Sequence, residues 1–193
     1  MGAAASNAVP MKGAPLTSPI GEVVATRLRD IPDFPLPGVT FKDFTPLLSD
    51  GPAFRAVVQD IARRYIDRVD VVVGIEARGF IFGAAVAYEL GIGFVPVRKA
   101  GKLPGSTHSQ TYDLEYGSAV IEIHTDALAR GTRTLVIDDI LATGGTAAAT
   151  CELIERAGAS VEAVDVLVEL GFLHGRTKLA GRTVHAMVSL AGP

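Results

Sequence analysis

Short apolar runs alternate with amphipathic stretches along most of the chain. Runs rich in β-branched residues are typical of strands buried on both faces, and four occur, at 71–73, 94–97, 135–137 and 161–170. Apolar positions at helical spacing predict helices before and between these strands, at 52–67, 80–90 and 145–157. The alternation predicts an α/β fold in which helices cover both sides of a central, mainly parallel sheet.

Three further segments complete this pattern. Ser18 followed by Pro19 is a typical helix start, and Ile20, Val23, Val24 and Leu28 then fall on one helical face. Two prolines and a glycine in 34–38 exclude a helix and a central strand, so we expect a rigid apolar loop there. The stretch 101–126 has flanking glycines and β-forming residues in its second half, which predicts an excursion with hairpin character.

Composition narrows the class of protein. The 193 residues suit one domain, and 48% hydrophobic with 20% charged residues is an ordinary globular mixture. A formal net charge of -3 argues against a nucleic-acid-binding protein, because neutralising phosphates needs a surplus of cations. No apolar run has the roughly 18 residues of a membrane span. The single cysteine, Cys151, cannot form an internal disulfide, so we expect a reducing, cytoplasmic location.

The N-terminal segment differs from the rest of the chain. Residues 1–15 are mostly alanine, glycine, proline and small polar residues, without the apolar stretch of a signal peptide. We therefore expect residues 1–15 to form a flexible tail and residues 16–193 to form the single domain.

The third predicted strand leads into a polar segment that carries chemistry. Two adjacent carboxylates, Asp138 and Asp139, follow the strand, and the small-residue loop Ala142–Thr146 leads into a helix. Ligands bind beyond the carboxyl ends of parallel strands, and successive N–H groups at a helix N-terminus suit a phosphate. The carboxylates suit ribose hydroxyls or a hydrated Mg²⁺, so the segment predicts a site for a phosphorylated ribose. The alternative is that one aspartate caps the helix and the other is solvated.

Five motifs resemble those of one enzyme family. The segment 136–146 resembles the motif with which type I phosphoribosyltransferases bind phosphoribosyl pyrophosphate (PRPP). More narrowly, the chain resembles the adenine phosphoribosyltransferase family over about 20–190, with the other motifs at 34–43, 76–80, 98–105 and 112–117. The resemblance implies the type I phosphoribosyltransferase fold, with a small hood and a flexible catalytic loop. It also implies a Mg²⁺-requiring homodimer that converts adenine and PRPP into AMP and pyrophosphate in purine salvage.

The resemblance assigns residues to the phosphates and the ribose. The 5′-phosphate would be held by Ala142, Thr143, Gly144, Gly145 and Thr146, and ribose hydroxyls by Asp138 and Asp139. Pyrophosphate would be bound by Arg78, Lys99, Lys102 and Tyr116. The Mg²⁺ ion would be held mainly through PRPP and water, without a direct protein ligand. From the residues alone, Arg78 could instead form a surface ion pair, and the lysines could lie on a solvated face.

The resemblance also implies a catalytic residue and a base pocket. Glu115 would close over the substrates and exchange a proton with the purine, a role that contributes about 10²- to 10⁴-fold to a rate; from the residues alone it could simply be solvated. Phe41 and Leu170 would pack on the two faces of adenine, and the backbone at Thr40 would read its edge. The family often has arginine where this chain has Lys42, which weakens any role for that side chain.

Two other functions remain open at this stage. The same PRPP site could serve another base, such as xanthine, guanine or orotate, although bases with carbonyl groups favour donor side chains and 34–43 offers few. A regulator could instead sense PRPP without catalysis, but it would need an added nucleic-acid-binding element.

Several residues are predicted to be purely structural. Cys151 shares a helical face with Ala147 and Ile154 and should be buried. Gly74 and Gly79 should be turn and close-packing glycines. The histidines show no metal-ligand spacing; they are His108, His124, His174 and His185.

Overall fold

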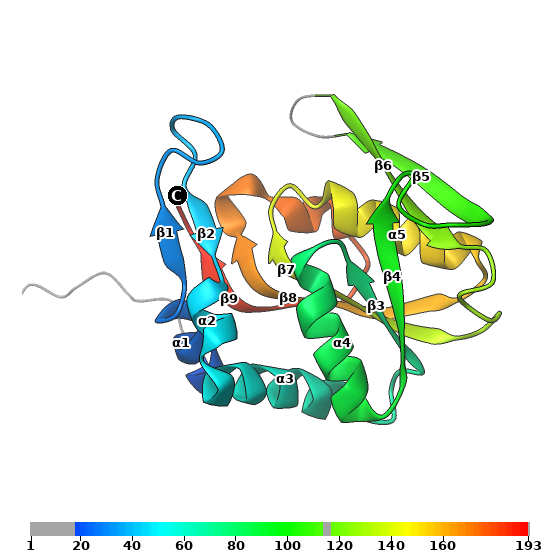
Figure 1. Ribbon diagram of the computed structural model, residues 1–193, viewed down its shortest axis with the longest axis horizontal. Helices are drawn as coiled ribbons and strands as arrows, with labels where there is room; N and C mark the ends of the chain where they lie inside the picture. The colour runs from blue at the N-terminus through cyan, green and yellow to red at the C-terminus, as the bar shows by residue number, and fades with distance from the viewer. Residues whose placement is uncertain (1–17, 114–116, 193) are drawn as a thin grey trace, which may run out of the picture.

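A central sheet with strand order β5-β6-β4-β3-β7-β8-β9 dominates the computed structural model, which describes residues 18–113 and 117–192 (Figure 1). The parallel strands are β4 (Gly93–Lys99), β3 (Val71–Ile75), β7 (Arg133–Leu141), β8 (Ser160–Leu170) and β9 (Val184–Leu190). The antiparallel hairpin of β5 (Thr107–Asp113) and β6 (Ser118–His124) pairs with the end of β4. The predicted parallel sheet and the predicted hairpin excursion are both confirmed.

Helices cover both faces of this sheet, as predicted. They are α1 (Pro19–Ala25), α2 (Thr45–Ser49), α3 (Gly51–Tyr65), α4 (Arg78–Leu90) and α5 (Gly145–Arg156). The apolar residues of α1 to α4 belong to one buried cluster and those of α5 to another, so α5 covers the second face. The sheet therefore lies between two hydrophobic layers.

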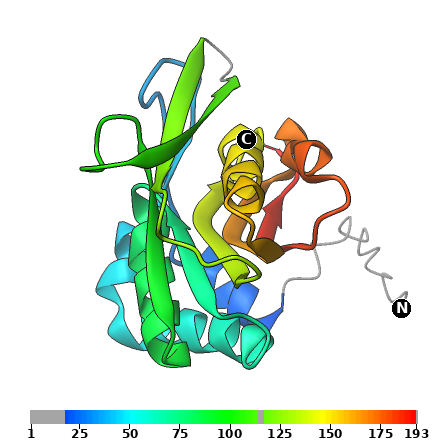
Figure 2. The same cartoon turned by 90° about the vertical axis from the view of Figure 1, so that its right-hand side faces the viewer.

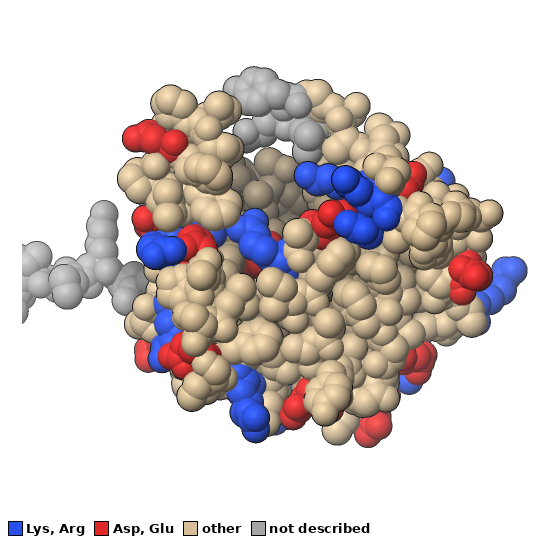
Figure 3. Space-filling view, in the orientation of Figure 1, with Lys and Arg blue, Asp and Glu red and all other residues tan. Residues whose placement is uncertain are grey.

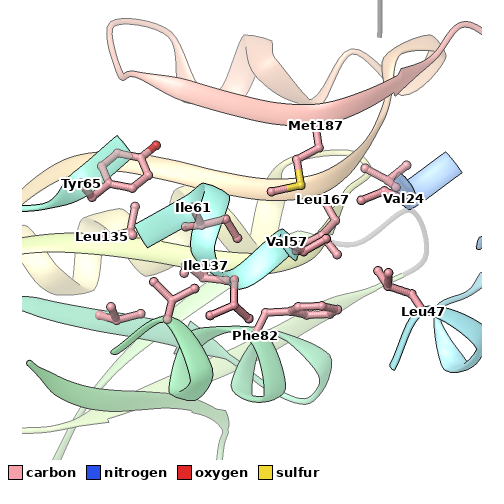
Figure 4. Packing of buried hydrophobic residues seen from close by; sticks show 14 of the residues in the cluster. Val24, Leu47, Val57, Ile61, Tyr65, Phe82, Leu135, Ile137, Leu167 and Met187 are labelled. Atoms are coloured by element: carbon pink, nitrogen blue, oxygen red, sulfur yellow. The ribbon is translucent and has the colours of Figure 1, made fainter. Parts of the chain in front are cut away.

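The central strand β7 contributes to both layers. Successive side chains of a strand point to opposite faces, so Leu135 and Ile137 pack toward α3 and α4 while Val136 packs toward α5. Figure 4 shows Ile137 among residues of the first layer, including Phe82 of α4 and Ile61 of α3. Each fully buried side chain of this size stabilises the fold by about 1.5–3 kcal/mol.

Some element boundaries differ from the predicted ones. Strand β7 continues to Leu141, which pairs with Glu169 of β8, so Asp138 and Asp139 lie within the strand rather than after it. The cap of α1 is confirmed, because Ser18 Oγ accepts a hydrogen bond of 3.2 Å from Gly21 N. However, α1 ends at Ala25, so Leu28, which was expected on the same helical face, lies beyond the helix.

Several short elements were not predicted. Strands β1 (Arg29–Ile31) and β2 (Phe41–Asp43) form a separate antiparallel sheet, and we call this sheet with its connecting loop, 32–40, the hood. Two 3-10 helices, η1 (Gly171–Leu173) and η2 (Gly175–Leu179), lie between β8 and β9. Figures 1 and 2 both show the hood loop and the β5–β6 hairpin rising on the same side of the sheet.

The residues predicted to be structural are found in such positions. Cys151 is fully buried in α5, and burial raises the pKa of its thiol to about 11. A Cβ atom on Gly74 would lie 2.6 Å from the Phe94 ring, and one on Gly79 would lie 2.7 Å from Ile137 O, which confirms both as close-packing glycines. Among the described residues, no helix combines the length and the apolar character that a membrane crossing needs.

Candidate active site

A cavity of about 430 Å³ opens at the carboxyl edge of the sheet, beneath the hood. Figure 3 shows the hollow between the hood and the β5–β6 hairpin, with Lys and Arg side chains at its margin. Residues that the sequence assigned to substrates line it, namely Thr40, Phe41, Arg78, Lys99, Asp138, Asp139, Ala142, Thr146 and Leu170. The fold therefore brings together residues from the hood, from helices α4 and α5, and from strands β4, β7 and β8.

The predicted phosphate loop forms one end of this site. A smaller cavity of about 80 Å³ is lined by Thr143, Gly144 and Gly145, and it shares Ala142 and Thr146 with the larger one. Gly144 precedes α5 with φ of 78°, a left-handed conformation that glycine adopts without steric cost. The first N–H groups of α5 have no acceptor within the helix and carry its positive dipole end. This geometry suits an anion.

The paired aspartates lie beside this loop with unused acceptor capacity. Asp138 Oδ1 accepts a hydrogen bond of 2.9 Å from Asp139 N, and Asp139 itself is only 4% exposed. Arg78 Nε lies 2.7 Å from Asp139 Oδ2, but this contact lacks hydrogen-bond geometry, so the oxygen has no hydrogen-bond partner among residues 18–113 and 117–192. Burial, and then the neighbouring Asp139 carboxylate, raise the pKa of Asp138 well above its usual range. Such oxygens suit ligands that donate hydrogen bonds.

Arg78 connects the aspartates to the base end of the cavity. It is the first residue of α4, and the close packing of Gly79 against β7 brings it near Asp139. Its guanidinium carbon lies 5.0 Å from the Phe41 ring centre, within the range of a cation–π contact. Arg78 thus forms an ion pair. The alternative from the residues alone was an ion pair on the surface, whereas this carboxylate lies inside the cavity.

The opposite side of the cavity carries Lys99. Glu76, at the end of β3, accepts hydrogen bonds from Lys99 N at 3.0 Å and from Arg98 Nη2 at 3.1 Å. The Arg98 hydrogen bond is the main cause that lowers the pKa of Glu76. The Lys102 side chain is exposed and does not line the cavity, and its carbonyl accepts from Arg98 Nη1 at 3.1 Å. A pyrophosphate role for Lys102 stays a prediction.

The base end of the cavity is mainly apolar. Phe41 packs edge-to-face on Phe34 at a centroid distance of 5.2 Å, and Leu170 ends β8 beside the same space. Lys42 is the buried cation at this end, with its side chain 9% exposed and its Nζ 2.9 Å from Asp30 Oδ1. Its charge is therefore paired within the hood.

Sequence reasoning missed several cavity residues. Glu76 and Tyr112 stand in motifs that the resemblance uses, so their motif membership was the available signal. Lys42 also stands in such a motif, 34–43, but the motif does not indicate its burial, which depends on the pairing of β1 with β2. Within the described part of the chain, no three His, Cys, Asp or Glu side chains are grouped so as to hold a metal ion.

Some predicted residues lie outside the described residues. They are Glu115, Tyr116 and the N-terminal segment 1–15. Their roles stay predictions from the sequence.

Comparisons with known proteins agree with the site. Residues 47–184 match the model of the phosphoribosyl transferase domain. An adenine phosphoribosyltransferase of Salinispora tropica is 59% identical over 170 residues, which are 88% of this chain and 90% of the relative. One from Streptomyces coelicolor is 55% identical over 183 residues, or 91% of this chain and 100% of the relative.

Solved structures show the same fold. The crystal structure of adenine phosphoribosyltransferase from Thermoanaerobacter pseudethanolicus matches with a TM-score of 0.85 at 46% identity, covering 88% of this chain and 99% of that chain. The Saccharomyces cerevisiae enzyme, crystallised with an imino-altritol bisphosphate and adenine, matches with a TM-score of 0.83 at 39% identity, covering 87% and 98%. This chain therefore belongs to the type I phosphoribosyltransferases and, within them, to the adenine phosphoribosyltransferase family.

Proposed function

We propose that this chain transfers the 5-phosphoribosyl group of PRPP to adenine, giving AMP and pyrophosphate in purine salvage. One observation carries the proposal: a continuous site joins an apolar wall at Phe41 and Leu170 to the paired aspartates and to the phosphate loop. These three parts suit the base, the ribose and the 5′-phosphate of AMP. The adenine and the bisphosphate in the yeast relative's structure support the same assignment.

The reaction demands positioning and charge stabilisation from the protein. The bond between the anomeric carbon and pyrophosphate breaks, adenine N9 bonds to that carbon through an oxocarbenium-like state, and the N9 proton leaves. Arg78 can turn its guanidinium fork from Asp139 to two phosphate oxygens of the leaving group. The released Asp139 and its neighbour Asp138 then accept from the ribose hydroxyls. Glu115, which follows β5 and precedes β6 in the sequence, would exchange the proton with the purine.

The aspartates also fit a Mg²⁺-loaded substrate. Among the described residues, no donor forms a hydrogen bond to Asp139 Oδ2, and burial together with the Asp139 carboxylate raises the pKa of Asp138. Metal-bound water supplies such donors, because Mg²⁺ usually keeps several waters when it binds with substrate phosphates. The Mg²⁺ ion would neutralise charge on pyrophosphate. Asp138 and Asp139 would hold its water shell.

The base wall favours adenine over bases with carbonyl groups. The Lys42 ammonium, beside Phe41 in the hood, is already paired with Asp30. A base that carries carbonyl oxygens would leave them facing the apolar side chains of Phe41 and Leu170, and unpaired polar groups are costly to bury. Adenine carries no carbonyl, and backbone groups around Thr40 can read its edge.

We also propose that the chain forms a homodimer through α4. Tyr88 is 87% exposed and Ile81, seven residues earlier on the same helical face, is 43% exposed. Figure 3 shows few charged side chains over the middle of this helix. Exposed apolar faces of this kind mark association sites, and a closed dimer uses the same face on both copies.

The cytoplasmic location proposed for this enzyme rests on the single cysteine.

A base-competition assay tests the proposed reaction. Purified protein is incubated with PRPP and Mg²⁺ and offered adenine, hypoxanthine, guanine, xanthine or orotate separately. We expect nucleotide with adenine alone. Product from another base would contradict the interpretation of the base wall, and no product from any base, with PRPP still bound, would favour a PRPP-sensing regulator.

A further inference from the structure

The backbone behind the phosphate loop belongs to the segment 171–179, which we call the backing segment. A Cβ atom built on Gly175 would lie 2.2 Å from Ala142 O and 3.1 Å from Gly144 N. A Cβ atom on Gly144 would lie 2.2 Å from Gly175 O. The two backbones therefore meet where neither residue has room for a side chain, and neither residue lines the main cavity.

An ion pair fixes the backing segment at this position. Arg176 Nε lies 2.8 Å from both carboxylate oxygens of Glu169, and its Nη1 donates at 2.8 Å to Val184 O. The Glu169 side chain is only 9% exposed, so this charge is buried and depends on Arg176 for its pairing. Arg176 thereby ties η2 to β8 and β9 beside the residue that touches the loop.

The pair also lies between two parts of the proposed site. Glu169 directly precedes Leu170, which lines the base end of the cavity. Arg176 directly follows Gly175, which touches the phosphate loop. Since β8 is a continuous strand of the sheet, the pair holds the loop at a set position relative to the base wall.

We propose that Glu169 and Arg176 are positioning residues for the reaction and that they act through Gly175 on the phosphate loop. This inference rests on the proposed function. The backing segment sets the positions of the loop N–H groups, so it governs affinity for ligands that carry the ribose 5′-phosphate. Pyrophosphate binds at the other end of the site, at Arg78, and is independent of the backing segment.

Gly175→Ala tests the contact itself. The dihedral φ of Gly175 is not in the left-handed region, so the added methyl acts by pushing on Ala142 and Gly144. We expect the Kd of AMP, measured by titration calorimetry, to rise at least about tenfold and the Kd of Mg²⁺-pyrophosphate to stay within about twofold, because small displacements of a binding group cost large factors. Gly51→Ala is the matched control, since nothing lies within 4 Å of its Cβ.

Arg176→Ala and Arg176→Lys test the ion pair. We expect Arg176→Ala to raise the KM of PRPP about fivefold or more with kcat within about twofold, the pattern of a lost binding interaction. Arg176→Lys should recover part of the loss, because it keeps the positive charge beside Glu169. Arg133→Ala is the control, because that arginine is equally exposed and pairs with Asp70 at the amino ends of the parallel strands, away from the cavity.

The outcomes separate this inference from the proposed function. Unchanged AMP affinity in folded Gly175→Ala and Arg176→Ala would overturn the positioning role. Equal weakening of AMP and pyrophosphate would also overturn it, since that pattern indicates general loss of structure. A wild-type protein that forms no AMP would refute the proposed function, whereas the contrast between AMP and pyrophosphate binding would still test the backing segment.

Discussion

Asp138 shows at the residue scale how the site departs from what stability alone would favour. Its carboxylate is next to Asp139, and burial together with that neighbour raises its pKa well above the ordinary value of 3.8. A carboxyl whose pKa is raised on folding binds protons more tightly in the folded state. Its contribution to stability is therefore lost as the pH rises through the folded pKa. At neutral pH the unliganded protein bears this cost.

Asp138→Asn should stabilise the unliganded protein at pH 7 and weaken PRPP binding. The amide keeps an oxygen that can accept from Asp139 N and carries no charge. Each kcal/mol recovered raises Tm by about 2–4 °C in a chain of this size. Losing one charge-assisted hydrogen bond to ribose should raise the KM of PRPP about tenfold or more. Thermal melting across pH and steady-state kinetics measure both effects.

The pH dependence provides the internal control for this substitution. The difference in unfolding free energy between Asp138→Asn and the wild type should shrink as the pH falls toward the pKa of Asp138 in the unfolded chain. The carboxyl is then protonated in both the folded and the unfolded protein. A lower Tm for the variant at pH 7 would contradict the cause assigned to the raised pKa of Asp138.

Glu115→Ala should lower turnover at least about tenfold, and up to the 10²- to 10⁴-fold typical of a positioned acid or base. PRPP binding should stay near normal, because the proposed role concerns the purine and not the phosphates. Single-turnover kinetics and a separate PRPP titration distinguish the two effects. Glu122→Ala, on β6 of the same hairpin, is a comparison variant outside the cavity lining. Unchanged turnover in Glu115→Ala would remove this residue from the mechanism.

At the scale of elements, a buried charge joins α3 to β8. Asp165 of β8 is fully buried, and Arg64 of α3 reaches it with Nη2 at 3.2 Å while also pairing with Asp60. His185, its neighbour on β9, has Nδ1 3.6 Å from the same carboxylate oxygen. Removing one member of such a pair leaves an uncompensated buried charge, which costs more than the pair itself contributes.

Arg64→Met should destabilise the fold by about 3–5 kcal/mol, because it leaves Asp165 without its main cation. The double variant Arg64→Met/Asp165→Asn should recover most of that loss, since the buried charge is then gone. Urea unfolding of both variants and of Asp165→Asn gives the coupling free energy. Additive effects in this cycle would show that α3 and β8 do not depend on the pair.

At the scale of the whole molecule, α4 exposes large apolar side chains on its outer face. Tyr88 and Ile81 expose apolar surface on a helix whose other face packs against the sheet. The start of this same helix supplies Arg78 to the cavity. Association through α4 would therefore support the position of a substrate-binding residue.

Tyr88→Glu should convert the proposed dimer into a monomer at micromolar concentration. Truncating or charging a central aromatic anchor commonly costs about 2 kcal/mol or more of association free energy. Sedimentation equilibrium measures the mass directly. Ile66→Glu is the control, because Ile66 is also exposed, at 63%, but follows α3. A wild-type protein that is monomeric in the same experiment would refute the dimer proposal outright.

Local patterns were sufficient for the central architecture and for much of the site. Strands β3, β4, β7 and β8 and helices α3 to α5 follow from hydrophobic periodicity, because each has a continuous apolar run or face. The phosphate loop and the paired aspartates are contiguous in the chain, so their joint role could be predicted before any contact was known. Strands β1, β2 and β9 were missed because pairing with a neighbouring strand, β1 with β2 and β9 with β8, stabilises them rather than a continuous apolar run.

The sequence by itself determined the fold class, the family and the chemical types of group at the site. Those depend on spacing and residue identity within short segments. Only the tertiary structure decided which groups meet across long separations, such as Arg78 on Phe41, Lys42 beside Asp30, and Gly175 against the phosphate loop. The physical reason is that burial, ion pairing and backbone contact depend on distances between segments, which hydrophobic periodicity does not specify.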